Sequence, residues 1–413
     1  MATLYIRKIT KLVDLLYISL VLLPVFDAIN GFLINQKNIY GVGSLYHLFV
    51  TILCIIYLLR TKLKNNVYFK ILLICSSSIL VSIFLNLILG EKIQSDSIDR
   101  IFKMITTVFY FYFFYILQKK ENKKNDFLLL IQRQIFLIYI ITLLADLTGI
   151  CNFAYTNSGR IGLYAGSNEP TIIFTITQVF LLWFITNRTK LSDLILFLIG
   201  EVCIVLTESK SGIVVSLILF IFFLIILKGK KDISKSFKIL AIFPIVFVGI
   251  IIGIQFVIPL IKNSFVARQS FLFEAWSSKE GTLAYISSGR IPRIESFILQ
   301  SLADYFNFNP FIGVIKTVFG IGATGEFIGT VIEMDYFDIL RYGGIVWIVC
   351  FFVLTQYVLT RAYNRLNSKI VFFAFVIIFI ESFFIGHVWN GGNSGIFFAM
   401  LCIFMSNNNW FRL

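Results

Sequence analysis

Long apolar runs separated by short polar segments make up most of this chain. Twelve runs reach or approach the length of about 20 residues that an α-helix needs to cross a bilayer. They lie near residues 12–34, 42–59, 69–89, 101–117, 127–144, 170–187, 191–207, 211–228, 239–261, 337–360, 369–386 and 393–406. Several are short, so eleven spans are the alternative count. The pattern predicts an all-α polytopic integral membrane protein of about twelve transmembrane helices, built as a single transmembrane domain over residues 1–413.

The first run follows a basic segment, as the apolar part of a signal peptide does. It has no small-residue cleavage site and contains Asp14, Pro24 and Asp27, so we interpret it as an uncleaved first span. Glu201 lies in the middle of the seventh run. Because a charge inside a membrane is costly, these three acids require buried partners or a water-filled cavity.

Lys and Arg are unevenly distributed between the two sides of the predicted bundle. With the N-terminus in the cytoplasm, 23 of the 36 basic residues fall on the cytoplasmic side and 13 on or near the outer side. Seven of the 13 belong to the stretch 261–341, and a loop of that length translocates largely regardless of charge. The relevant comparison is therefore 23 against six, which predicts that both termini are cytoplasmic.

Composition supports the membrane assignment and excludes several other classes of protein. Apolar residues make up 58% of the chain and charged residues 14%, with a mean hydropathy of +0.88. A soluble enzyme, or one anchor carrying a large soluble head, is therefore excluded. The net charge of +14 is mostly topological signal, so we expect no nucleic-acid partner. The six cysteines form no C-x-x-C pair and only two histidines are present, so neither a metal centre nor a cofactor is expected.

Two predicted outer segments, 145–169 and 262–336, are too long to be simple connectors. Apolar residues recur at helical spacing through 288–302, where Pro292 suits a first helical turn. We expect an amphipathic helix on the outer membrane surface here, within an extracytoplasmic loop that belongs to the same domain.

The first candidate site residues lie at the outer start of the sixth span. Arg160 precedes a helix whose first turn contains Pro170, and an Arg beside a helix N-terminus favours anion binding. Glu169 is either a carboxylate that complements the helix dipole or one that handles a proton.

Three further basic residues are expected at the same face. Lys210 lies in the tight connection between the seventh and eighth spans, where it either binds an anion or extends to the interface. Arg290 and Arg293 share one face of the predicted loop helix, as anion ligands or as solvated charges. Together with Arg160 they predict a cationic pocket for a ligand with a lipid tail and a phosphorylated headgroup.

Acidic residues near the tenth and eleventh spans could supply a general base. Asp335 is either a dipole partner at the start of a helix or that base. Arg341 follows within the same span and is a further candidate for binding the phosphorylated substrate. Glu381 and His387 form a second candidate pair. The alternative, which we prefer, is an interfacial turn at His387 followed by a membrane-belt tryptophan, Trp389.

The order of these features resembles the Wzy-type polysaccharide polymerases, which share a superfamily with the O-antigen ligases. Five pieces match in order between about residues 155 and 350, each unspecific when taken alone. They are Arg160 and Gly162 with Glu169-Pro-Thr171, Ser209-Lys-Ser-Gly-Ile213, Ser288-Gly-Arg290, Phe319-Gly-Ile-Gly322, and Asp335 followed by Tyr342-Gly-Gly-Ile345.

The resemblance implies a GT-C-related helical fold in the bacterial cytoplasmic membrane. It also implies a metal-independent glycosyltransferase that joins undecaprenyl-diphosphate-linked repeat units at the outer face, for O-antigen or capsule. Glu169 and Asp335 would lie at the site, while Arg160 and Arg290 would hold glycan or diphosphate. A flippase and a chain-length regulator of the same pathway would be partners, with membrane lipids around the bundle.

Two other activities are alternatives to polymerisation. Ligases of the superfamily usually have a histidine just before the tenth-span helix, where this chain has Met334 and Asp335. That difference favours a polymerase. A lipid-linked oligosaccharide flippase is the other alternative, although no repeat of one half of the chain in the other is visible.

Overall fold

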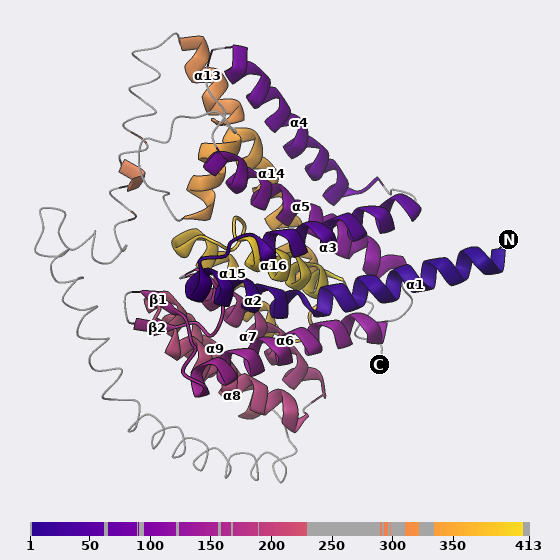
Figure 1. Ribbon diagram of the computed structural model, residues 1–413, viewed down its shortest axis with the longest axis vertical. Helices are drawn as coiled ribbons and strands as arrows, with labels where there is room; N and C mark the ends of the chain where they lie inside the picture. Colours follow the sequence, from indigo (N-terminus) through magenta and orange to yellow (C-terminus); the bar gives the residue numbers. More distant parts are fainter. Residues whose placement is uncertain are drawn as a thin grey trace, which may run out of the picture.

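The computed structural model confirms a helical bundle (Figure 1). It describes residues 2–61, 65–88, 90, 95–120, 124–155, 158–166, 168–188, 190–228, 290, 293–295, 298, 310–321 and 334–407. The helices are α1 (Ala2–Val21), α2 (Leu23–Lys37), α3 (Val42–Arg60), α4 (Val67–Ile88), α5 (Ser95–Lys120), α6 (Lys124–Leu147), α7 (Glu169–Arg188), α8 (Leu191–Leu206), α9 (Lys210–Lys228), α13 (Pro310–Phe319), α14 (Asp335–Arg365), α15 (Lys369–Ile385) and α16 (Gly392–Ser406). A hairpin of β1 (Phe153–Tyr155) and β2 (Ser158–Arg160) lies between α6 and α7.

The chain is a multi-pass integral membrane protein. Within the described residues, seven helices are long and apolar enough to cross a membrane, or eight if α1 and α2 form one bent span. Helices α8, α15 and α16 match three more predicted runs but contain only 16, 17 and 15 residues. The predicted span 239–261 lies outside the described residues, so the count of twelve stays a prediction.

The predicted first span is bent rather than straight. The helix axis turns by 45° between Leu12–Val21 and Leu23–Lys37. Pro24 occupies the first turn of α2, where the missing N–H group is tolerated but would interrupt a continuous helix. The bend directs α2 toward the segment that follows the hairpin, where Gly31 lies directly against the backbone of Leu163 and Tyr164.

Helices α7 and α16 form the centre of the bundle. Almost every residue from 170 to 185 and from 394 to 406 is buried, which is expected for helices that are apolar on all sides. Helix α16 packs against α5, α7 and α14. This arrangement places the connection before α16 inside the protein.

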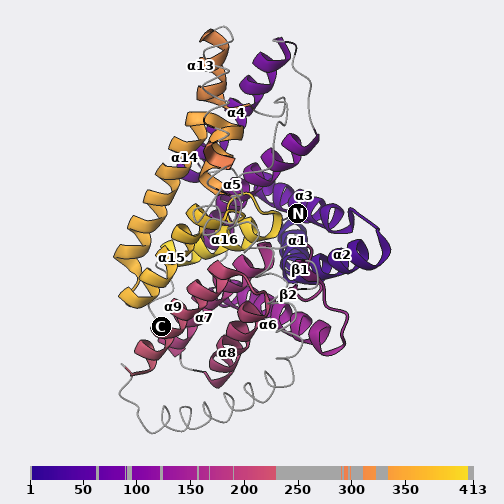
Figure 2. The same cartoon turned by 90° about the vertical axis from the view of Figure 1, so that its left-hand side faces the viewer.

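Two glycines let α13 and α14 approach closely. A side chain on Gly320 would collide with the backbone of Tyr342, and one on Gly344 would collide with Val318 and Gly320. Gly344 has φ 65° and interrupts α14 in a conformation that favours glycine. Figure 2 shows the resulting group, in which α13 and the first part of α14 lie beside α4.

The predicted outer segments are described to different extents. Segment 145–169 contains the β1–β2 hairpin, so it carries structure of its own as expected. Of the predicted helix 288–302, residues 290, 293–295 and 298 are described, and they are helical. The rest of that prediction lies outside the described residues.

Candidate functional site

Five helices begin at one face of the bundle. Hydrogen bonds join the start of α14 to the turn between α15 and α16, and the start of α7 to the start of α16. The middle of α5 contacts the same turn, since Thr107 donates to the carbonyl of Trp389 at 2.9 Å. Helix α9 begins beside α7, where Gly212 lies against Thr171. These directions are the ones that the predicted alternation of spans requires, and they bring the positive ends of helix dipoles together.

Asp335 fixes the turn between α15 and α16. Its carboxylate is fully buried, and Oδ2 accepts hydrogen bonds from the backbone N–H groups of Val388 and Trp389 at 2.8 and 2.9 Å. Asp338, one turn later, accepts from the side-chain amide of Asn390 at 3.2 Å. No described residue forms a hydrogen bond with Asp335 Oδ1. Asp335 therefore has a clear structural role, with one oxygen left over.

Glu169 caps a helix that is distant in sequence. Its Oε1 accepts from the N–H groups of Asn393 and Ser394 at 2.6 and 3.1 Å, at the N-terminus of α16. The Ser394 hydroxyl also donates to Glu169, at 3.4 Å, and to the carbonyl of His387. The expected dipole-complementing role is present, although the carboxylate serves α16 in addition to beginning α7.

His387 lies in this turn in a left-handed conformation, with φ 67°. Burial, together with the nearby positive charges of Arg100, Arg290 and Lys103, lowers the pKa of His387 to about 3. The imidazole is therefore neutral at pH 7, with one nitrogen as a donor and the other as an acceptor. Its surroundings are cationic.

Sequence reasoning missed Arg100 and Lys103 of α5. Asp99 pairs with Lys103 at 2.6 Å, and a side chain on Gly392 would lie 3.9 Å from Lys103 Cε. The available signal was a pair of basic residues one helical turn apart at the predicted outer start of the fourth span. Basic residues beside a span ordinarily reflect membrane topology, so this signal alone does not indicate a site.

The other predicted basic residues are placed less closely together. Arg160, at the end of β2, forms an ion pair with Asp146 at 2.7 Å, so a carboxylate already neutralises it. Arg341 is buried in α14, 5.9 Å from the ring of Tyr342. Arg293 is partly buried, as is Arg290.

Lys210 begins α9, and its side chain lies outside the described part of the structure.

Among the described residues, no hydrogen bond or ion pair joins Glu381 to His387, although the sequence predicts them as a pair. Glu381 is buried within the bundle, where it accepts from Thr175 of α7 at 2.9 Å. No described residue bonds to its Oε1. The two candidates thus have separate surroundings.

The prediction that Trp389 belongs to a membrane belt is wrong. Trp389 is fully buried and its ring lies 4.7 Å from those of Phe351 and Phe398. The cause is the backbone: Asp335 binds the N–H group of Trp389 and Thr107 binds its carbonyl, which draws the turn into the aromatic core.

The buried acids predicted inside spans have different outcomes. Asp27 is buried and pairs with His47 at 2.7 Å, and Glu201 accepts a hydrogen bond from Ser216, so both have the expected partners. Asp14 is exposed on α1. Among the described residues, no three His, Cys, Asp or Glu side chains lie together as a group of metal ligands.

Comparisons with known proteins do not identify a family for this chain. No protein-family model, curated protein or solved structure matches it. The functional proposal therefore depends on the geometry of the site and on the motif resemblance.

Proposed function

We propose that the protein is a polysaccharide polymerase that joins undecaprenyl-diphosphate-linked repeat units at the outer face of the cytoplasmic membrane. The observation that carries the proposal is the set of Arg100, Lys103 and Arg290 close to a neutral His387, at the face where five helices begin. The motif resemblance supplies the substrate class, and this cationic environment fits its diphosphate.

The chemistry needs stabilisation of a departing anion. An acceptor hydroxyl oxygen bonds to the anomeric carbon of the growing chain, and the bond from that carbon to the lipid diphosphate breaks with its electron pair on the diphosphate. Guanidinium groups stabilise this charge, since their planar forks bond two phosphate oxygens. Fixed charges aimed at a developing anion are often the largest single contribution to catalysis.

The hydroxyl proton must pass to a base. In this proposal the group that accepts the proton is the neutral His387 imidazole or Oδ1 of Asp335. Glu169 and the first oxygen of Asp335 act as positioning groups, because their hydrogen bonds fix the turn that carries His387. A bound diphosphate would offset the nearby cations and raise the His387 pKa, which makes the imidazole a better base.

Deletion of the gene in its own host tests the proposal. Loss of long glycan chains with retention of single-repeat material supports a polymerase. Long chains that accumulate on the lipid carrier would instead indicate a ligase. Repeat units retained in the inner leaflet would indicate a flippase. A polymer ladder from purified protein and lipid-linked repeat units would then establish the reaction directly.

A further inference from the structure

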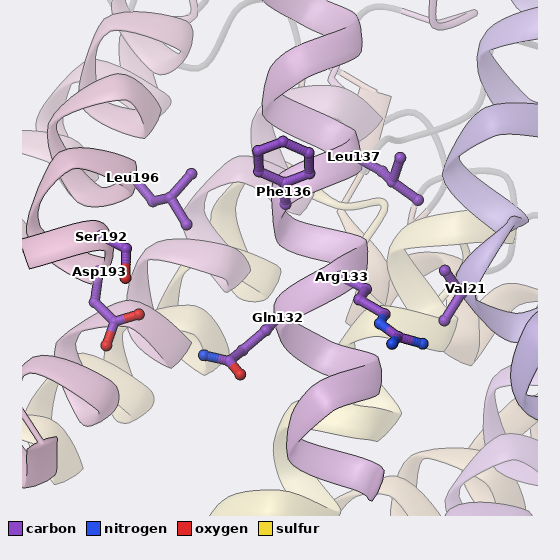
Figure 3. A pocket seen from close by; sticks show the side chains of 8 residues that line it. All are labelled: Val21, Gln132, Arg133, Phe136, Leu137, Ser192, Asp193 and Leu196. Atoms are coloured by element: carbon purple, nitrogen blue, oxygen red, sulfur yellow. The ribbon is translucent and has the colours of Figure 1, made fainter. Parts of the chain in front are cut away.

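A groove outlined by α1, α6 and α8 lies at the other end of the bundle from the candidate site. Helix α7 begins at the site and ends 20 residues later at Arg188, a length of about 30 Å. The groove beside Arg188 has a volume of about 460 Å³, within the range of about 300–1,000 Å³ for ligand sites. Its lining residues are Val21, Gln132, Arg133, Phe136, Leu137, Ser192, Asp193 and Leu196 (Figure 3).

Most of the surface area that lines the groove is apolar, and the groove is on the outer, lipid-facing side of the bundle. Phe136 is 53% exposed on the spanning part of α6, so its ring contacts lipid chains in a bilayer. Leu137 and Val21 lie on one side of Phe136, and Leu196 of α8 on the other (Figure 3). These side chains suit acyl chains.

The acid in the groove carries no free charge. Asp193 is 2% exposed, and its two carboxylate oxygens accept from Nε and an Nη of Arg188 at 2.9 and 3.0 Å. A bidentate pair of this kind is neutral overall and geometrically fixed. It therefore does not repel an anion.

Arg133 is the charge that this pairing leaves uncompensated. It is exposed on α6, seven residues or about 10 Å along the helix from Asp126, where the membrane span begins. No hydrogen bond or ion pair joins it to another residue in the described part of the chain. Phe136 lies one turn deeper on the same face. A guanidinium at this depth is costly unless an anion accompanies it.

We propose that this groove binds an anionic phospholipid of the bilayer. Arg133 pairs with the headgroup phosphate, and the acyl chains lie over Phe136, Leu137 and Leu196. The predicted topology puts Arg133 at the cytoplasmic end of α6, and basic pockets between spans on that side bind anionic headgroups. A zwitterionic lipid also carries phosphate, but its ammonium group offsets the attraction. The proposal does not depend on the polymerase activity.

A tryptophan at the groove reports which lipid occupies it. The variant Phe136→Trp is placed in phosphatidylcholine vesicles that contain either brominated phosphatidylglycerol or brominated phosphatidylcholine, and quenching is measured relative to the unsubstituted protein. We expect a preference of about fivefold for the anionic lipid, the factor expected for one cationic side chain near a membrane surface. The preference disappears when Arg133→Gln is added.

Two controls isolate the contribution of the groove. Phe352 is 51% exposed near the middle of α14, so Phe352→Trp reports ordinary lipid contact at similar depth and shows no preference. Arg60→Gln removes an exposed arginine at the end of α3 and leaves the preference at position 136 unchanged. Equal quenching by the two lipids, or a preference that survives Arg133→Gln, overturns the proposal.

A second measurement does not depend on the tryptophan substitution. Native mass spectrometry of the unsubstituted protein counts retained phosphatidylglycerol molecules. Arg133→Gln should lose one such molecule that Arg60→Gln retains. Identical counts for the two variants contradict the proposal.

Discussion

Where α7, α14 and α16 begin, the carboxylates of the partly buried Glu169 and the buried Asp335 accept hydrogen bonds from backbone N–H groups. Where α14 and α16 end, the guanidinium of Arg365 instead donates to the carbonyl of Ser406 at 2.7 Å. Each charge is opposite in sign to the helix end at which it lies, as the helix dipole favours. Glu169, Asp335 and Arg365 thus have structural explanations. The charges that need another explanation are cations near helix N-termini, where the dipole is also positive.

Arg100, Lys103 and Arg290 are such charges. They lie near His387, among helix starts that already produce positive potential, and Lys103 pairs with Asp99. Like charges close together destabilise the protein until an anion joins them. The comparison of the two ends therefore distinguishes charges that hold helix ends together from a cluster of cations that an anionic ligand would stabilise.

The largest effect is expected when the cations near His387 are removed. Arg290→Gln and Arg100→Gln should each lower polymer formation by about 10²–10³-fold, the usual cost of one group that stabilises a developing anion. The measurement is the rate of polymer-ladder formation on lipid-linked repeat units. Arg60→Gln, at an exposed position on α3, is the matched control and should retain the full rate.

Arg160→Gln sharpens the same comparison. Asp146 already neutralises Arg160, so we expect a smaller loss than for Arg290→Gln. Normal chain length in both variants would contradict the proposed reaction. A larger loss for Arg160→Gln would place the diphosphate near the hairpin instead.

Asp335→Ala should cause the next largest effect, on stability. The variant leaves the buried N–H groups of Val388 and Trp389 without their acceptor, at a cost of about 1–3 kcal/mol each. We expect a fall of several degrees in the unfolding midpoint in detergent. Asp99→Ala, at a carboxylate that is 57% exposed, should change the midpoint little. An unchanged midpoint for Asp335→Ala would show that Asp335 does not hold the turn.

The ionisation of His387 tests the cationic environment itself. With the chain containing only two histidines, NMR of labelled imidazoles can follow this one, and His387→Gln assigns its signal. With a pKa of about 3, the imidazole should stay almost entirely neutral from pH 7 down to pH 5 and be about one-tenth protonated at pH 4. Adding a short isoprenyl diphosphate should raise the pKa by at least about one unit, which corresponds to about 1.4 kcal/mol. An ordinary pKa without ligand, or no response to diphosphate, would refute the proposed environment.

The same depressed pKa predicts how stability depends on pH. Below an unfolded-state pKa of about 6.5, the unfolded chain takes up a proton at His387 that the folded protein does not. This residue therefore contributes stability above about pH 6.5 that is lost progressively as the pH falls toward 3. His387→Gln should reduce the fall of the unfolding midpoint between pH 7 and 4. An identical fall in the two proteins would rule out this contribution.

Local signals in the sequence predicted much of the fold. Apolar runs located the helices, and acids and Pro170 marked helix starts. Each of these features depends on residues a few positions apart. The bend at Pro24 could have been predicted from the same rule, since proline interrupts a helix.

The assembly of the site could not be predicted in this way. Asp335 contacts residues 53 and 54 positions later, and Thr107 contacts Trp389 across 282 positions. Such pairings depend on which helices are neighbours, and hydropathy does not determine that. Candidate acids at the correct helix ends could therefore be identified from the sequence, but the groups that they bind could not. Nothing in the sequence indicated that Trp389 lies in the core.

Glu169→Gln is expected to have the smallest effect, and it separates two roles for this carboxylate. A glutamine keeps an acceptor oxygen for the N–H groups of Asn393 and Ser394 but loses the charge, so stability should fall by less than about 1 kcal/mol. If Glu169 is only a cap, polymer formation should fall little and in proportion to stability. A carboxylate that handles the proton instead predicts a loss of about 10²-fold or more at unchanged stability. Every hydrogen bond from a described residue to the Glu169 carboxylate comes from the first turn of α16, so we expect the capping outcome. That outcome would leave His387 and Asp335 as the groups that can accept the proton.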